Sequence, residues 1–370
     1  MLVYVLNYLS LPVYMLLFRK KRTASILVAI QMLLILCLKY KYLGVDYTVY
    51  ERGFNFISSL SFSQLLSTFN VFGISDLSTV VSFESGYTFL NWVISHLGFS
   101  YEEFLLIYNL FFVICIYFFI SRLSNEPMIA FALVLSTSVF EYSFGIIRQT
   151  LAMSLLMLAV LNYFKGKNRA TIVLLAIAFL FHRTALIFVL LFLLNKIEIN
   201  KKRFKYIFAG ETLAVFIAPY MLHGIVAKIL SLMGKSGYIS TASSYSIGGQ
   251  LILFIIIGIL ILRFFDFDDI TKEKSICLWG YIVLMIVQIL GSFGGIIARA
   301  VWLPFILLIV MIPNMFCEPN KVKYLDLWFG NYHAIRYNQL VKFGINVFGL
   351  LFMIYNLSGS PINPYIPFWK

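Results

Sequence analysis

The stretch FGIIRQTLAMSLLMLAVLNYF, residues 144–164, has the length and hydrophobicity of a membrane-spanning helix, but Arg148 lies in its first turn. A helix needs about 20 apolar residues to cross the hydrocarbon core of a bilayer. A guanidinium keeps its proton there, and placing it near lipid costs about 3 kcal/mol. The rest of the chain must therefore provide something for Arg148 to bind.

The remainder of the sequence is equally apolar. Of its 370 residues, 61% are hydrophobic and 12% are charged, a composition that no soluble domain of this size has. Lipid cannot hydrogen-bond to the backbone, so unbroken apolar runs of this kind indicate helices. We predict an all-α polytopic integral membrane protein, one membrane domain over residues 1–370 with about twelve transmembrane helices. The predicted spans are 2–18, 23–40, 101–121, 127–140, 144–164, 169–181, 183–195, 204–222, 249–265, 276–292, 298–313 and 340–357.

The basic residues predict the orientation of these spans. RKKR, residues 19–22, follows the first apolar run, and no basic residue precedes that run, so we expect the N-terminus outside and no cleaved signal peptide. If the spans alternate in direction from an outer N-terminus, 20 of the 29 Lys and Arg residues lie in short inner segments. The 16 acidic residues divide equally between these inner segments and the rest of the chain. This asymmetry is typical of multi-pass proteins. It accounts for the net charge of +13 without nucleic acid as a partner.

Three segments do not follow a simple alternation of spans. The apolar runs 169–181 and 183–195 are short, and they indicate either a hairpin of two short helices or one long helix broken at His182 and Arg183. The outer segment 41–100 is about sixty residues long, and we expect it to carry short interfacial helices. The inner loop 314–342 either docks a partner or lies on the membrane.

Several charged residues on the outer side belong to no ordinary loop. Arg148, Arg299 and the pair His182-Arg183 each lie at a helix end, at the same expected depth. A single arginine at a helix end often reaches the headgroups without further function, and Arg183 and Arg52 allow that interpretation. Arg148 and Arg299 are flanked closely by apolar residues and favour a functional role. The acids and aromatics of the outer segment that face them are Asp46, Tyr47, Tyr50, Glu51, Glu84 and Tyr87.

This arrangement points to an anionic lipid ligand on the outer side. Arginine offers a planar, permanently charged fork to phosphate oxygens, so two or three arginines can hold a pyrophosphate. His182 has no His, Cys or carboxylate at metal-ligand spacing, and the four cysteines are scattered, so we expect no metal site and no cofactor. Asp46 and Glu84 also fit an interpretation as solvated loop acids.

The order of four short motifs resembles the EpsG-like family of exopolysaccharide and O-antigen polymerases, the Wzy type. The motifs are GVDYTVY, ESGYTFLNWVISHLGFS, FGIIRQTLAMSLLMLAV and FLFHRTALIFV. Arg299 and the closing NPYIPFWK resemble later features of the family, whereas Ser85 stands where a proline is more usual. The resemblance covers residues 1–195 well and the rest loosely. The matching positions are Gly44, Asp46, Tyr47, Tyr50, Glu84, Gly86, Tyr87, Leu90, Asn91, Arg148, Gln149, His182 and Ala185.

The resemblance implies a membrane glycosyltransferase of the bacterial cytoplasmic (inner) membrane with its active site facing the periplasm. Such polymerases transfer a growing glycan from undecaprenyl pyrophosphate to a lipid-linked repeat unit, in exopolysaccharide or O-antigen (lipopolysaccharide) synthesis. It also implies a chain-length regulator as partner. We expect Arg148 and Arg299 to stabilise the leaving pyrophosphate, with Arg183 in support, and His182, or Asp46 or Glu84, to act as base. The remaining substrate-binding candidates are Tyr47, Tyr50, Tyr87, Asn91 and Gln149.

Three other interpretations stay open from the sequence. A flippase for the same lipid-linked sugar would share the anionic ligand, but transporters usually place polar groups near the midplane within repeats. A membrane acyltransferase that modifies polysaccharide would use a histidine and leave the arginines unexplained. A non-catalytic assembly subunit would not need charges gathered on the outer side.

Overall fold

The computed structural model describes residues 1–370 except 19, 41–42, 45, 70–73, 79–80, 233–248, 292–298, 318–330, 361, 368 and 370. The protein is 81% helical, which confirms the expected all-α class. The chain divides into two compact units, Met1–Leu186 with Phe329–Lys370, and Ile187–Trp328.

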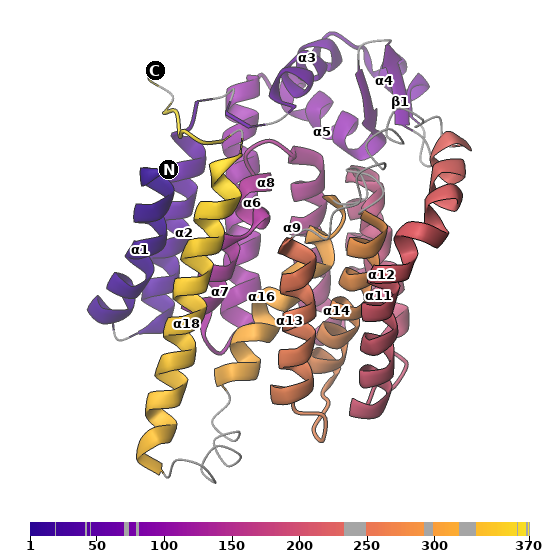
Figure 1. The fold of residues 1–370 in the computed structure, drawn as a ribbon. Helices are drawn as coiled ribbons and strands as arrows, with labels where there is room; N and C mark the ends of the chain where they lie inside the picture. The colour runs from indigo at the N-terminus through magenta and orange to yellow at the C-terminus, as the bar shows by residue number, and fades with distance from the viewer. Residues whose placement is uncertain are drawn as a thin grey trace. The chain divides into compact units, whose positions relative to one another are not determined.

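The first unit is a bundle of long helices (Figure 1). Helix α9 packs against α10 and α6, α2 packs against α6, and α18 packs against α7. Helix α6 begins with a capping box, in which Ser100 and Glu103 satisfy each other's backbone N–H groups. The helices of this bundle are α1 (Leu2–Leu17), α2 (Lys21–Cys37), α6 (Tyr101–Leu123), α7 (Pro127–Ser136), α8 (Ser138–Tyr142), α9 (Ile147–Phe164), α10 (Asn168–Phe181) and α18 (Asn331–Ser358).

The segment 41–100 folds onto one end of this bundle (Figure 1). It contains helices α3 (Tyr47–Ser58), α4 (Phe62–Ser67) and α5 (Ser85–His96). It also contains an antiparallel hairpin of β1 (Ile74–Ser78) and β2 (Val81–Glu84), with Ile74 opposite Glu84 and Ser75 opposite Phe83. The sequence pattern does not indicate this hairpin. Its second strand leads directly into α5, so Glu84 stands at a strand–helix junction.

The second unit is also a helical bundle. Helix α14 (Lys272–Gly291) packs against α12 (Lys201–Leu232), α13 (Gly249–Phe264) and α16 (Trp302–Cys317). Helix α11 (Leu186–Leu194) begins at the boundary between the units, directly after the 3₁₀ turn η1 (Arg183–Ala185). The backbone of His182, between α10 and η1, is extended. The helix is therefore interrupted here, as both the hairpin interpretation and the broken-helix interpretation of residues 169–195 require.

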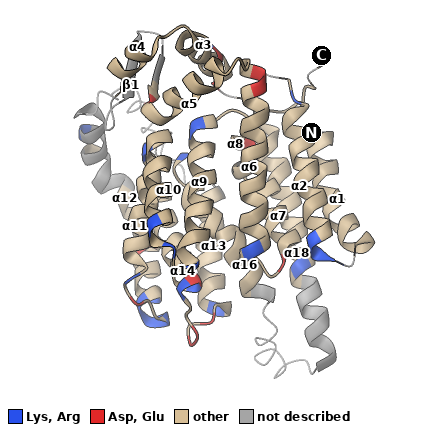
Figure 2. Ribbon diagram, turned by 180° about the vertical axis from the view of Figure 1, so that it is seen from behind, with Lys and Arg blue, Asp and Glu red and all other residues tan. Residues whose placement is uncertain are grey.

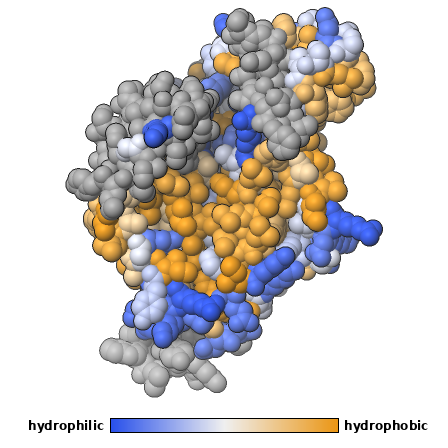
Figure 3. All heavy atoms as spheres, turned by 90° about the vertical axis from the view of Figure 1, so that its right-hand side faces the viewer, coloured by the Kyte–Doolittle hydropathy of each residue, from blue (hydrophilic) through white to orange (hydrophobic). Residues whose placement is uncertain are grey.

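The helices have the character of membrane spans. Hydrophobic side chains cover much of the surface in Figure 3, and Lys and Arg gather toward one end of the helices in each unit (Figure 2). Four described helices are long and apolar enough to cross a bilayer: Tyr101–Leu123, Ile147–Phe164, Lys272–Gly291 and Val341–Ser358. Six further apolar helices of the described chain are shorter. The protein is therefore an all-α membrane protein, while twelve spans stay a prediction.

Near the predicted inner loop, the helices extend further than expected. Helix α16 runs to Cys317 and α18 begins at Asn331, so both enter the predicted loop 314–342, whose residues 318–330 lie outside the described chain. Glu126 accepts hydrogen bonds from Lys342 at 2.8 Å and lies 3.1 Å from Lys21. These ion pairs tie the start of α2, the α6–α7 loop and α18 together within the first unit.

Candidate functional site

The partner of Arg148 is Glu84. The Arg148 Nη1 donates to Glu84 Oε2, and the Arg148 Nε lies 3.5 Å from the Tyr50 hydroxyl. The side chain of Glu84 is 10% exposed and that of Arg148 is 24% exposed. The pair therefore joins the first turn of α9 to the β2–α5 junction, and the Arg148 side chain stays partly exposed.

Aromatic rings surround the Arg148 guanidinium. It lies 5.1 Å from the Phe83 ring centroid and 5.8 Å from the Tyr50 centroid. The rings of Tyr50 and Phe83 are stacked, and Tyr87 meets both edge-on. Burial raises the pKa of Tyr50, against the opposing effect of Arg148, and raises that of Tyr87 well above its usual value. Both tyrosines are therefore neutral, and Tyr50 contacts the arginine through its ring and its hydroxyl.

Two glycines of the motifs allow the outer segment to approach the bundle. A Cβ on Gly86 would lie 2.8 Å from the backbone oxygen and the Cβ of Leu180, and one on Gly44 would lie 2.9 Å from the Phe144 oxygen. Gly44 also has φ +126, which favours glycine. Close packing at these two points fixes α5 on α10, and residue 44 on the turn before α9.

His182 and Arg183 lie in the same region of the first unit. The turn η1 packs on α9, and α10 packs on α5 at the Gly86–Leu180 contact. Phe181 packs against the aromatic cluster that includes Tyr50 and Tyr87. The structure therefore gathers Arg148, Glu84 and the His182–Arg183 corner around the β2–α5 junction.

The hydrogen bonds of His182 define its tautomer. The Thr184 backbone N–H donates to the His182 Nδ1 at 3.3 Å, and the Thr184 Oγ1 lies 2.6 Å from the same nitrogen. A backbone N–H can only donate, so Nδ1 is an acceptor and the neutral ring carries its proton on Nε2. Acting as a base requires Nδ1 to be released from Thr184.

The remaining candidates of the outer segment differ in accessibility. Tyr87, Asn91 and Gln149 are buried, with exposed fractions of 0%, 0% and 4%. The Tyr87 hydroxyl and the Asn91 Oδ1 have no hydrogen-bond partner within the described chain. Asp46, at the N-terminus of α3, is exposed, and Tyr47 is half-buried. Asp46 and Tyr47 are thus accessible from the surface, whereas Tyr87, Asn91 and Gln149 are part of the packed interior of the site.

Arg299 belongs to the second unit, where it is exposed just before α16. Its convergence with Arg148 stays a prediction.

Two contributions to the site were missed by sequence reasoning. Lys39 donates to the Phe144 carbonyl oxygen at 2.6 Å, and the Tyr108 hydroxyl donates to the Ser143 carbonyl oxygen at 2.9 Å. Both contacts hold the turn before α9. For Lys39, the signal available in the sequence was a cation directly after an apolar span and five residues before Gly44.

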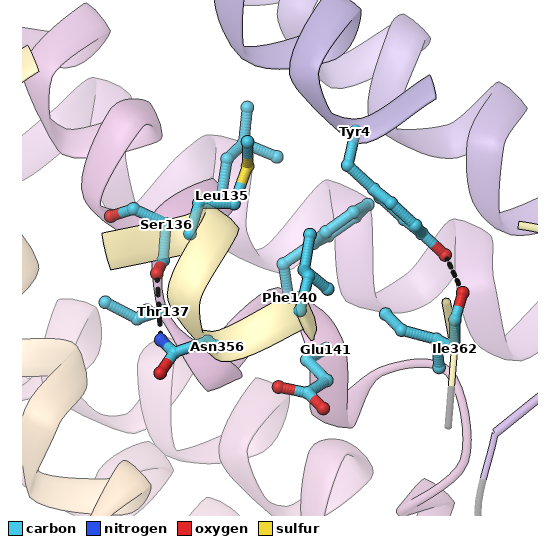
Figure 4. A pocket seen from close by; sticks show the side chains of 10 residues that line it. Tyr4, Leu135, Ser136, Thr137, Phe140, Glu141, Asn356 and Ile362 are labelled. Carbon is cyan, nitrogen blue, oxygen red and sulfur yellow. Dashed lines mark hydrogen bonds between the residues drawn. The ribbon is translucent and has the colours of Figure 1, made fainter. Parts of the chain in front are cut away.

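Two cavities of the first unit lie apart from the Arg148–Glu84 pair. One, of about 10 Å³, is lined by Tyr4, Phe140, Glu141 and Asn356 among others. Beside it, Asn356 Nδ2 donates to the Ser136 carbonyl oxygen at 3.3 Å, and the Tyr4 hydroxyl donates to the Ile362 carbonyl oxygen at 2.8 Å (Figure 4). It holds at most one water. The other, of about 530 Å³, is lined by residues 36–40 of the α2 end and by Glu102, Leu105, Leu106 and Asn109 of α6. Its size suits a lipid chain or another small ligand.

No group of three or more His, Cys, Asp or Glu residues in the described chain is placed to hold a metal ion. The chemistry that the site offers is a fixed guanidinium on a partly exposed side chain, a histidine, and nearby carboxylates. This set suits an anion that carries developing charge, such as a phosphate leaving group.

A family model described as the EpsG family matches residues 23–368. The chain belongs to the EpsG family. The resemblance seen in the short motifs is thus confirmed over nearly the whole chain. Comparison with curated proteins and with solved structures finds no match. Membership of the EpsG family indicates a polysaccharide polymerase of the glycosyltransferase type, embedded in a membrane.

Proposed function

We propose that this EpsG-family protein transfers a growing glycan from undecaprenyl pyrophosphate to a lipid-linked repeat unit on the outer leaflet of the bacterial cytoplasmic membrane. The observation that carries the proposal is the partly exposed Arg148 side chain, whose guanidinium is held by Glu84 and aromatic rings at the start of a helix long and apolar enough to span a membrane. A pyrophosphate whose lipid chain lies in the bilayer presents its oxygens at this depth.

In the proposed reaction, a hydroxyl of the acceptor sugar attacks the anomeric carbon of the donor glycan. A new C–O bond forms, the bond from the anomeric carbon to the pyrophosphate oxygen breaks, and the pyrophosphate leaves with the electron pair. Arg148 stabilises this growing negative charge, and it is preorganised to do so because Glu84, Tyr50 and Phe83 already fix its position. We propose Arg299 and Arg183 as the further cations of the clamp.

The proton of the acceptor hydroxyl goes to His182 or to a carboxylate. Of the two carboxylates we favour Asp46, because it is exposed whereas the side chain of Glu84 is only 10% exposed. For His182 to act, its Nδ1 must be released from Thr184 and can then accept the proton. Asp46 and Tyr47 contact sugar hydroxyls, and Tyr50, Tyr87, Asn91 and Gln149 support them.

The proposal includes no metal, so activity should persist in EDTA. The partners we propose are the lipid-linked oligosaccharide, membrane lipid and a chain-length regulator.

The test is a reaction in liposomes that contain the purified protein and defined lipid-linked repeat units. We expect the wild type to give a ladder of glycan lengths. Arg148→Ala should give only single units at equal insertion, and Arg148→Lys, which keeps the charge but not the planar fork, should give a weak ladder. A normal ladder from Arg148→Ala would reject this site. A wild type that moves the lipid-linked unit across the bilayer without lengthening it would be a flippase.

A further inference from the structure

We propose that Lys39 is a positioning residue for Arg148: its buried ammonium fixes the turn 143–146 from which α9 begins. The inference rests on the proposed function, because it assumes that Arg148 binds the leaving pyrophosphate. Lys39 lies beyond the C-terminal end of α2 and is not one of the residues that face the glycan.

The ammonium of Lys39 contacts one residue of this turn, Phe144. Its Nζ donates to the Phe144 carbonyl oxygen at 2.6 Å and lies 4.8 Å from the centroid of the Phe144 ring. The side chain is only 6% exposed, and no carboxylate in the described chain pairs with it. Burying an ammonium without a counter-anion is unfavourable in free energy. The position of the Lys39 ammonium therefore depends on the carbonyl oxygen and the ring of Phe144, which it contacts.

The turn needs such support because α9 has no cap of its own. No side chain caps the N-terminus of α9, and Ile146 has φ −96 and ψ 61, outside the helical region. The turn is held from outside by Lys39 at Phe144, by Tyr108 at Ser143 and by the close approach of Gly44 to Phe144. Arg148 follows Phe144 by four residues, so a shift of this turn displaces the guanidinium directly.

The C-terminal segment covers Lys39. Lys39 pairs with Pro367 in an antiparallel bridge, and the Tyr40 N–H donates to the Ile366 oxygen at 2.7 Å. The Tyr365 hydroxyl donates to the Ile35 oxygen at 3.0 Å.

The other ionisable groups around this site come from each neighbouring element. Cys37 belongs to the end of α2, Tyr365 to the C-terminal segment and Glu102 to α6, where it lines the same cavity as Lys39. On α8, Glu141 accepts from Ser360.

The test compares Lys39→Met, Lys39→Arg and wild type in the liposome reaction, with Lys165→Met, an exposed lysine of the loop after α9, as matched control. Rates are expressed per correctly inserted molecule. We expect Lys39→Met to lower kcat about tenfold or more, with a much smaller change in KM, because a displaced catalytic group acts on the transition state. Lys39→Arg should recover most of the rate, and Lys165→Met should equal wild type.

The division of the effect between kcat and KM, and the rescue by arginine, separate positioning from simple stability. Equal kcat values for Lys39→Met and wild type, or a Lys39→Arg rate no higher than that of Lys39→Met, would overturn the inference. If Arg148→Ala is inactive while Lys39→Met is fully active, the proposed function stands and only the role of Lys39 fails. If Arg148→Ala is active, the proposed function itself fails.

Discussion

At the scale of single residues, the Arg148–Glu84 ion pair occupies a position where two packed apolar side chains would give the fold equal or greater stability. Replacing a buried ion pair with well-packed hydrophobic residues is often neutral or stabilising. The Arg148–Glu84 pair, enclosed by Phe83 and Tyr50, therefore contributes less to stability than its hydrogen bonding suggests. In the proposed function, a ligand that needs the cation explains why this pair stands at the end of a helix long and apolar enough to span a membrane.

His182 provides the prediction that belongs to this scale. We expect His182→Gln to lower the turnover of the liposome reaction about 100-fold, as is typical for the loss of a general base, while binding of the lipid-linked substrate is retained. Glutamine can still donate a hydrogen bond but cannot take the proton. Turnover and substrate binding are measured on the same preparation.

The matched control for this variant is His96→Gln. His96 is an exposed histidine of α5, stacked on Trp92, and its replacement should leave turnover unchanged. Wild-type turnover in His182→Gln would remove His182 as the base and leave Asp46 as the remaining candidate.

The sequence predicts that Arg148 has a binding partner, because a permanent charge within an apolar run is unfavourable near lipid unless another group interacts with it. It does not predict which acid is the partner, since Asp46, Glu51 and Glu84 lie in one long segment whose path cannot be derived from local patterns. Lys39 was missed because a lysine after an apolar span usually reaches the headgroups, whereas here the C-terminal segment folds over it. That covering contact joins residues more than 300 positions apart.

At the scale of elements, the helices were predictable and the hairpin was not. The apolar runs give the positions of most helices to within a few residues, because a bilayer imposes both length and composition. The strands β1 and β2 are five and four residues long, and DLSTVVSFE has no strong alternation and no tight-turn dipeptide. Their pairing depends on where α3 and α5 dock, which is tertiary information.

The contact between α5 and α10 leads to a prediction for Gly86. Adding a methyl group there would place it 2.8 Å from the backbone of Leu180, which cannot move aside as a flexible side chain can. We expect Gly86→Ala to lower the free energy of unfolding by about 1–3 kcal/mol and to displace Glu84, two residues away. Thermal unfolding in detergent measures the first effect, and polymer length in liposomes measures the second.

Gly210→Ala is the control for this substitution. Gly210 lies within α12 and has nothing within 4 Å of its added Cβ, so alanine should be neutral or slightly stabilising in a helix. If Gly86→Ala and Gly210→Ala have the same unfolding temperature, the close approach of α5 to α10 is not a constraint on the fold.

At the scale of the whole molecule, the distribution of charge predicts how the protein lies in the membrane. Helix α9 has the Arg148–Glu84 pair at its first turn and is followed by the basic segment 165–169 at its other end. If basic loops face the cytoplasm, Arg148 faces outward, as a polymerase acting on the outer leaflet requires. The twelve predicted spans depend on the same alternation.

Cysteine labelling tests this orientation. Cys37, Cys115, Cys277 and Cys317 are first replaced with serine or alanine, and single cysteines are then introduced by Ser67→Cys in α4 and Lys167→Cys after α9, both at exposed positions. A membrane-impermeant maleimide should label the Ser67→Cys protein in intact cells and the Lys167→Cys protein only after permeabilisation. The opposite pattern would place Arg148 on the cytoplasmic side, where an outer-leaflet pyrophosphate cannot reach it, and the proposed reaction would then be excluded even though family membership would stand.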